Sequence, residues 1–243
     1  MASPSRFTSC EILLEDAALL IINKPAGALS HPNSAADEAP CAFHGSYDTT
    51  QRCFTSDAGK LWLIHRLDEG TSGVLLAAKS ELAAQRCREA FEQDRVRKHY
   101  TMLVSGTNMK PSGVWLDHLS TQGGGGKVRT KVVPNAKPNA ELSYRVVKQN
   151  REHRASLLDI DLITGKTHQI RVQAASRSWP ILGDEVYGDF ALNRLLKKDY
   201  GLARLCLHAA SLELKHPVSQ VRLKLTAPLP RDIADPAKAL GVF

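Results

Sequence analysis

One run of twelve residues constrains this chain more than any other stretch, residues 65–76 with the sequence HRLDEGTSGVLL. It places a single aspartate, Asp68, between an arginine and a turn that contains two glycines. Apolar segments flank this turn, 61–64 before it and 74–78 after it. Short apolar runs of this kind are typical of buried strands. We therefore expect two strands to hold the Asp68 loop rigidly, as a catalytic group requires.

The charge of the chain is unevenly distributed. Residues 1–60 hold four Lys and Arg against seven Asp and Glu, a net charge of −3, whereas residues 61–243 hold 28 against 18, a net charge of +10. A basic surface suits a polyanion such as RNA, because lysines and arginines replace the cations that condense on its phosphates. Many basic proteins bind no nucleic acid, so charge alone leaves the partner open.

The composition excludes several classes of protein. The five cysteines are odd in number and form no CxxC pair, which favours reduced thiols in a cytoplasmic protein over a disulfide framework. Cys41, His44 and Cys53 lack a fourth zinc ligand at a convincing spacing, so we expect no metal site. No stretch approaches the ~20 apolar residues of a membrane helix. The N-terminus lacks the apolar core of a signal peptide, although a weak organellar targeting character stays open.

Periodicity predicts a chain rich in strands with interspersed helices. After a flexible N-terminus (1–10), strands are expected at 11–14, 18–22, 98–104, 158–162, 207–214 and 221–225, with paired strands over 113–148. Helices are expected at about 81–96 with Ser80 as cap, at 167–176 with Thr167 as cap, and at 231–239. Residues 33–60 have no period and are expected to form a long loop.

Without regular βαβ alternation, the fold class is α+β. We expect a single catalytic domain, 11–243, with a curved, largely antiparallel mixed sheet that is flanked by helices and crossed by a basic RNA-binding cleft. A glycine-rich hairpin is expected at 120–133. In it Lys127, Arg129 and Lys131 alternate and therefore share one face of a strand. A basic arm that closes on RNA and an ordinary solvated hairpin are equally good interpretations.

The 65–76 run resembles the signature of the RluA family of RNA pseudouridine synthases, HRLD-x-x-TSG-x-LL. Five further segments resemble other elements of that family: 23–27 (NKPAG), 98–100 (KHY), 164–173 (TGKTHQIRVQ), 180–188 (PILGDEVYG) and 207–217 (LHA, then HP). The departures are Lys166, where arginine is common, and Gln173, where histidine is common. Some relatives carry a small RNA-binding module before the catalytic domain. We expect none here, so that RNA recognition falls to the catalytic domain.

The resemblance implies an isomerase that converts uridine to pseudouridine in structured ribosomal or transfer RNA, with no cofactor and no metal. This reaction breaks the N1–C1′ bond, turns the uracil and rejoins it through C5. Asp68 is the implied nucleophile, which attacks the sugar or helps to expel the base. Arg171 is the implied cation that grips this carboxylate in two bonds. The alternative for Asp68 is an aspartate that only forms a turn.

The resemblance also assigns residues to RNA. Arg66 fills the space that a flipped nucleotide leaves; a phosphate contact or a structural ion pair is the alternative. Tyr100 stacks on the flipped uracil and takes part in proton transfer, and a core tyrosine is the alternative. His65, Lys98 and His168 are further candidates for contact with RNA, and we expect the two histidines to orient groups or form hydrogen bonds. We expect Asp184 and Tyr187 to brace the pocket that holds the uracil, and the strand around 223–225 to line it.

Two other functions remain open from the sequence. One is an RNA-binding protein that keeps the fold and lacks turnover, and the other is a carboxylate-dependent glycosidase or nucleosidase. The presence of Asp68, Tyr100 and Arg171 together favours the enzyme over the first, and the basic charge argues against the second. We expect a cytoplasmic monomer whose partner is RNA. The sequence does not choose between ribosomal and transfer RNA or indicate the uridine that is modified.

Overall fold

The computed structural model describes residues 8–32, 39–124 and 127–243. They form two compact units. Unit 1 comprises Met1–Arg97 and Ala209–Pro228, and unit 2 comprises Lys98–His208 and Leu229–Phe243. Strand β12 (Leu207–Lys215) therefore begins in unit 2 and continues in unit 1.

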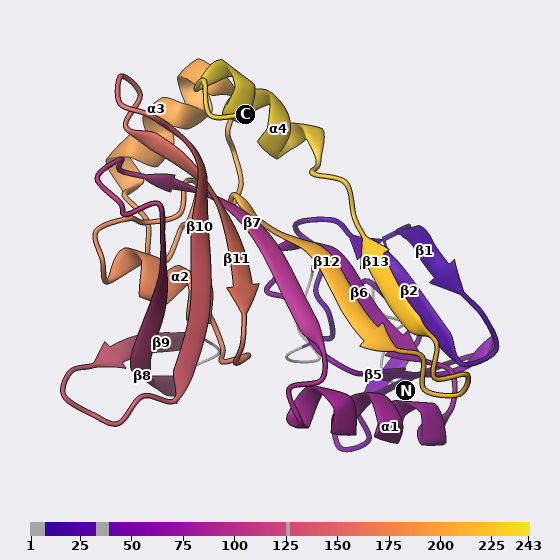
Figure 1. Ribbon diagram of the computed structural model, residues 1–243. Helices are drawn as coiled ribbons and strands as arrows, with labels where there is room; N and C mark the ends of the chain where they lie inside the picture. Colours follow the sequence, from indigo (N-terminus) through magenta and orange to yellow (C-terminus); the bar gives the residue numbers. More distant parts are fainter. Residues whose placement is uncertain (1–7, 33–38, 125–126) are drawn as a thin grey trace. The chain divides into compact units, whose positions relative to one another are not determined.

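Unit 1 is a largely antiparallel sheet with one helix (Figure 1). Its other strands are β1 (Glu11–Glu15), β2 (Leu19–Lys24), β3 (Ser46–Asp48), β4 (Cys53–Ser56), β5 (Gly59–Leu63), β6 (Ser72–Ala78) and β13 (Arg222–Thr226). β6 is buried along its whole length and pairs antiparallel with β2. β3, β4 and β5 form an antiparallel meander that leads into the Asp68 loop. Helix α1 (Glu81–Glu92) packs beside β5 and β6.

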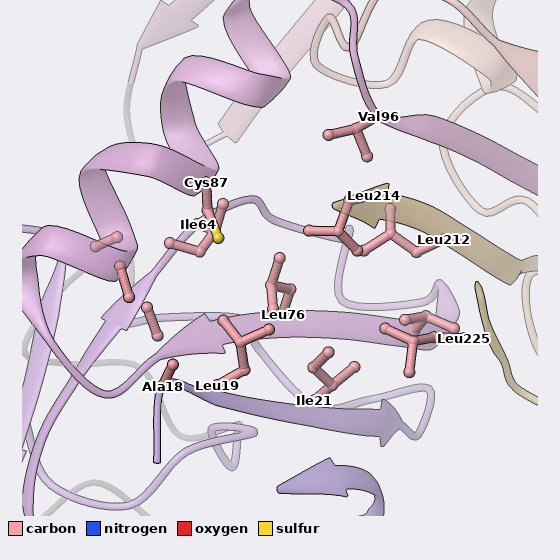
Figure 2. Close-up of a cluster of buried hydrophobic side chains, with 14 of the residues drawn as sticks. Ala18, Leu19, Ile21, Ile64, Leu76, Cys87, Val96, Leu212, Leu214 and Leu225 are labelled. Carbon is pink, nitrogen blue, oxygen red and sulfur yellow. The ribbon is translucent and has the colours of Figure 1, made fainter. Parts of the chain in front are cut away.

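The core of unit 1 lies between the sheet and α1. Figure 2 shows Leu19 and Ile21 of β2, Leu76 of β6 and Cys87 of α1 pointing toward one another. These leucine and isoleucine side chains are fully buried. Each contributes about 1.5–3 kcal/mol through removal of its surface from water. The strands on either side of the Asp68 loop are thus fixed by a packed core.

Unit 2 is an antiparallel sheet with the strand order β7-β11-β10-β8-β9. Its elements are β7 (Arg97–Ser105), β8 (Ser112–Gly124), β9 (Lys127–Val133), β10 (Ala140–Asn150), β11 (Ala155–Leu162), α2 (Gln169–Ala175), α3 (Phe190–Tyr200) and α4 (Arg231–Ala239). Helix α2 packs beside β8 and β9 (Figure 1).

Most of the predicted elements are confirmed. The structure contains the predicted α+β class, the largely antiparallel pairing, the paired strands within 113–148 and the helix at 231–239. The hairpin of β8 and β9 pairs as far as Gly124 opposite Lys127, and residues 125–126 lie outside the described residues. The flexible N-terminus, the domain bounds 11–243 and the basic cleft stay predictions.

The prediction of one long loop over 33–60 is wrong in its second half. Strands β3 and β4 occupy 46–48 and 53–56, and β5 begins at Gly59. Aromatic packing is the cause: the ring of Phe54 lies 5.7 Å from that of Phe43 and 4.7 Å from that of Tyr47. Burial of large rings stabilises short strands whose other residues are polar. Residues 33–38 lie outside the described part of the chain.

The helix bounds also differ from the predictions. Ser80 caps α1 as expected, accepting a hydrogen bond from the Ala83 amide at 3.2 Å. The helix ends at Glu92 instead of 96, because Asp94 adopts a left-handed φ of 52° and Val96 turns back into the core. The predicted cap Thr167 is wrong, since α2 begins at Gln169 and the residue before it is His168.

Helix α3 was not predicted. Its start is set by Asp189, whose carboxylate accepts from the amides of Ala191 and Leu192 at 2.9 and 3.0 Å. It ends at Gly201, which adopts a left-handed φ of 67°. Both are standard helix-end signals. Only Leu196 of this helix is fully buried, so its apolar periodicity is weak.

Candidate active site

Asp68 lies in the loop between β5 and β6 of unit 1, half-buried. Its backbone carbonyl accepts from the amide of Thr71 at 3.0 Å, which closes the turn. The prediction that two strands hold this loop is confirmed. Gly73 is required where β6 begins, because its φ is 115° and a Cβ there would lie 2.2 Å from the carbonyl oxygen of Ala209.

The segment 24–30 holds the backbone on both sides of Asp68. On one side, the Ser30 hydroxyl donates to the Leu67 carbonyl at 2.8 Å and accepts from the Leu67 amide at 2.9 Å. On the other, the carbonyl of Glu69 accepts from the Lys24 ammonium at 3.1 Å and from the Gly27 amide at 2.9 Å. Residues 67 and 69 are therefore both fixed by side-chain or backbone groups distant in sequence.

Lys24 is wholly buried, with 0% of its surface exposed. Its ammonium also donates to the carbonyls of Pro25 and Ala28 at 2.9 and 2.6 Å. Burial of a charge is unfavourable unless several hydrogen bonds compensate for it. Through these hydrogen bonds Lys24 connects the turn after β2 to the Asp68 loop. Residues 23–27 resemble a family element, but the sequence does not indicate these contacts of Lys24.

The two residues that precede Leu67 have different environments. His65 is held: its Nε2 accepts from the Leu76 amide at 3.2 Å, and its ring stacks on Phe91 at 5.2 Å. These two contacts fix the ring, and the orienting role stays a prediction. Arg66 is exposed at the surface. The RNA contacts expected of both residues stay predictions.

Unit 2 contains the other predicted catalytic residues. Tyr100 lies on β7, opposite Ile160 of β11, and is buried with 8% of its surface exposed. Lys98 lies on the same strand, and its ammonium donates to the carbonyl of Ile163 at 2.8 Å. Arg171 lies in the first turn of α2, as expected, and is also buried.

The guanidinium of Arg171 forms a two-bond pair with Asp184. The Nε–Oδ2 and Nη2–Oδ1 distances are 2.8 and 2.9 Å. The Asp184 carboxylate also accepts from the amides of Val186 and Tyr187. Burial acts to raise the pKa of Asp184, but the hydrogen bond and charge of Arg171 and these two amides lower it below its usual value. Asp184 thus braces Arg171, and the predicted pair of Arg171 with Asp68 stays a prediction.

Tyr187 connects α2 to the β8–β9 hairpin. Its hydroxyl lies 2.9 Å from Nδ1 of His168 and accepts from the Thr130 amide at 2.9 Å. The Arg171 guanidinium lies over its ring, 5.2 Å from the centroid. The predicted bracing role of Tyr187 therefore has a structural basis, and it includes His168, which adopts a left-handed φ of 56°.

The structure describes the side chains of two of the three cations predicted on the hairpin. Arg129 and Lys131 are exposed, while Thr130 between them is buried, as alternation requires. The side chain of Lys127 lies outside the described part. Arg129 donates to the Val186 carbonyl at 3.2 Å. A cavity of about 380 Å³ lies beside this strand and is lined by Gln122, Arg129, Thr130, Lys131, Val132, Val172, Ala175, Ser176 and Tyr187.

Among the residues that the structure describes, no three His, Cys, Asp or Glu side chains gather as a set of metal ligands. Within the same residues, no helix is both long and apolar enough to cross a membrane.

The run around Asp68 and the KHY strand lie within a longer region that matches a known family. A family model described as RNA pseudouridylate synthase matches residues 18–176. The chain belongs to this family. The match confirms the resemblance to RluA-type RNA pseudouridine synthases, and it covers Asp68, Tyr100 and Arg171.

Individual members of the RNA pseudouridylate synthase family align over nearly the whole chain. The ribosomal large subunit pseudouridine synthase C of Vibrio cholerae is 35% identical over 218 residues, covering 90% of this chain and 65% of that protein. An uncharacterised RNA pseudouridine synthase of Bacillus subtilis is 32% identical, covering 92% of this chain and 70% of that protein. The chain thus spans slightly less than two thirds of the Vibrio relative.

A solved structure of the same family agrees in fold. The human RNA pseudouridylate synthase domain containing 4 protein superposes with a TM-score of 0.69 at 28% identity, covering 95% of this chain and 93% of that one.

Proposed function

We propose that this protein is an RNA pseudouridine synthase that isomerises uridine in ribosomal RNA, with Asp68 as its nucleophile. The observation that carries the proposal is the family match, which includes the complete 65–76 run on a loop that is held on both sides. The names of the relatives support ribosomal RNA as the substrate class. Transfer RNA is the alternative substrate.

The proposed reaction starts from a stacked uridine. The nucleotide must leave the stack before any group reaches C1′, at a cost of a few kcal/mol. Arg66 is exposed and two residues from Asp68, so we assign its planar guanidinium to the vacated position. The Asp68 carboxylate then attacks the sugar or assists departure of uracil, and the base turns and rejoins C1′ through C5.

Tyr100 and Arg171 complete the proposal. The buried ring of Tyr100 offers a flat surface for the detached uracil, and its phenol is the candidate group for transfer of the C5 proton. The cation of Arg171, oriented by Asp184, would keep the active carboxylate ionised. His65, Lys98, Lys127, Arg129, Lys131 and His168 are proposed contacts to RNA. No cofactor takes part. We expect a cytoplasmic monomer.

The test is release of tritium from RNA labelled at uracil C5, because the new glycosidic bond displaces the C5 hydrogen. The substrate is total cellular RNA from a strain without the gene, and native protein is compared with Asp68→Asn. We expect release by the native protein and a loss of at least about 1000-fold in the variant, since asparagine keeps the shape and removes the nucleophile.

The same assay separates the alternatives. Appreciable residual turnover by the folded Asp68→Asn protein would exclude Asp68 as nucleophile. RNA binding without release by the native protein would favour the non-catalytic RNA-binding protein.

A further inference from the structure

A cavity in unit 2 lies between strand β9 and helix α2. β9 is the last strand in the order of its sheet and pairs with β8, so its second edge has no strand beside it in the part of the chain that the structure describes. Helix α2 packs beside β9 (Figure 1). The cavity has a volume of about 380 Å³. Sites for small organic ligands have volumes of about 300–1,000 Å³, so it has room for a ligand of the size of a nucleotide.

The wall of the cavity that α2 supplies is mainly apolar. Val172, Ala175 and Ser176 line it, and their spacing of three and four residues places them on one face of the helix end. From the strand side, Val132 lines the cavity and belongs to the same small apolar cluster as Val172. The ring of Tyr187 also packs against that cluster. The wall therefore suits a flat group with apolar faces.

The hydroxyl groups that line the cavity are already hydrogen-bonded within the protein. The Ser176 hydroxyl donates to the carbonyl of Gln173 at 2.9 Å, and the Thr130 hydroxyl lies 3.1 Å from that of Thr121. The phenol of Tyr187 accepts from the Thr130 amide at 2.9 Å. Because these groups are satisfied, they do not make the wall unfavourable for an apolar ligand face.

The strand side of the cavity carries the groups that suit an anion. Gln122, Arg129 and Lys131 line it and are exposed. Within the described ranges no carboxylate forms an ion pair with either cation. The bond from Arg129 to the Val186 carbonyl uses one nitrogen of its guanidinium. A guanidinium has five N–H donors, so this bond positions Arg129 and leaves donors for a phosphate.

The open edge of β9 adds backbone groups. The Thr130 amide points to this edge, since it donates to the phenol of Tyr187. Residues two apart on an antiparallel strand direct their backbone groups the same way, so the amide and carbonyl of Val132 point to this edge too. A donor and an acceptor side by side match the hydrogen-bonding edge of a nucleobase.

We propose that this cavity binds one unstacked nucleotide of the RNA substrate, with its base against the apolar wall and its phosphate on Arg129 and Lys131. The inference rests on the proposed function for RNA as the source of the nucleotide. Asp68, Tyr100 and Arg171 are not among the described residues that line the cavity, so this nucleotide is a second one beside the uridine that is modified. Sequence-specific recognition of RNA acts on unstacked bases, so the cavity contributes to the choice of RNA.

The experiment measures the affinity for a fluorescently labelled RNA hairpin with a random loop sequence, at several salt concentrations. Asp68→Asn protein is the parent, so that the RNA is not turned over. Ala175→Phe fills the cavity without a change of charge; it should weaken binding about tenfold and keep the salt slope, because it displaces a base. Lys131→Gln should make the slope of log affinity against log salt shallower by about 0.7–0.9, because it removes a phosphate contact.

The matched controls are Ala191→Phe and Lys197→Gln, which make the same two changes at exposed positions of α3 in the same unit. Both should keep the affinity and the salt slope of the parent. Thermal unfolding of each variant checks folding. An affinity of Ala175→Phe equal to that of Ala191→Phe would overturn the site.

A second measurement uses the parent protein and does not depend on the folding of a cavity variant. With 4-thiouridine in the random loop, irradiation should crosslink the RNA to the peptide that contains Tyr187, and no crosslink there would overturn the site. Titration with uridine monophosphate tests the other source of a nucleotide. Binding that Ala175→Phe abolishes, with an unchanged affinity for RNA, would overturn RNA as the ligand. Absence of tritium release by the native protein, with the effect of Ala175→Phe on RNA intact, would instead refute the enzyme and leave the nucleotide site standing.

Discussion

At the scale of single residues, the position of Asp68 depends on side chains that come from one short segment, 24–30. Ser30 holds the backbone before it and Lys24 the backbone after it. A catalytic group must be placed within a fraction of an ångström, and its supports determine whether it is. With Asp68 as the proposed nucleophile, we therefore expect turnover to depend on these supports as well as on the carboxylate.

Lys24→Met is expected to lower the turnover rate far more than the affinity for RNA. Removal of the ammonium leaves the carbonyls of Pro25, Ala28 and Glu69 without this donor, which costs about 1–3 kcal/mol for each group that stays unsatisfied. A displacement of about 1 Å in a reacting group can reduce the rate about 100-fold. Single-turnover tritium release gives the rate, and urea unfolding gives the stability.

The control for Lys24 is Lys79→Met, which removes a surface lysine of unit 1 that pairs with Glu15 at 2.6 Å. Exposed ion pairs contribute about 0–1 kcal/mol, so this variant should keep both stability and rate. A folded Lys24→Met protein with the native rate would show that Lys24 is not needed to position the Asp68 loop.

The candidate nucleophile Asp68 could be proposed from the sequence, and the groups that hold its loop could not. Asp68 belongs to a contiguous run whose spacing is itself informative. Lys24 lies in the 23–27 element, and nothing in its local sequence indicates a contact with Glu69, 45 residues away. Contacts between residues so far apart in the sequence leave no local pattern in it.

At the scale of elements, one phenol connects the basic hairpin to α2. Tyr187 accepts from Thr130 of β9 and bonds to His168 at the start of the helix. The hairpin carries Arg129 and Lys131, so its position relative to α2 sets where these cations lie. Strand and helix are connected here through a loop residue.

Tyr187→Phe should therefore loosen β9 selectively. The loss of one partly buried hydroxyl lowers stability by about 1 kcal/mol, and the amides of 127–133 should exchange their hydrogens faster. Hydrogen exchange followed by mass spectrometry reports this strand directly. Tyr200→Phe on α3 is the control, since it also removes one hydroxyl, at a contact with His153 at 3.3 Å. Equal rates of hydrogen exchange at 127–133 in both variants would rule out that Tyr187 connects β9 to α2.

The elements that the sequence failed to predict share a physical cause. Helix α3 buries only Leu196 fully, and β3 and β4 are short and mostly polar. Their stability comes from end caps and from the packing of aromatic rings, which periodicity does not report. Helix α4 and the paired strands of the hairpin could be predicted because apolar residues recur at the period of each element.

At the scale of the whole molecule, charge is organised differently for RNA and for stability. The net charge of +10 over residues 61–243 is a long-range attraction for a polyanion. The hairpin cations Arg129 and Lys131 are exposed, where salt screens them. The pair of Arg171 and Asp184 is buried and serves the fold.

The buried pair of Arg171 and Asp184 leads to a prediction about unfolding in acid. The folded-state pKa of Asp184 is lowered, so its contribution to stability is fully present above the unfolded pKa of about 3.9. This contribution is lost as the pH falls through the lower, folded-state value, because the unfolded state then binds the proton more readily.

The free energy of unfolding, measured in urea between neutral and acid pH, should fall steeply below about pH 4. Asp184→Asn should be less stable at neutral pH by about 3–5 kcal/mol and should show a shallower acid dependence. Asp232→Asn, which alters the exposed pair with Arg204, should follow the native curve. A native slope in Asp184→Asn would show that the acid sensitivity of the protein arises from other carboxylates.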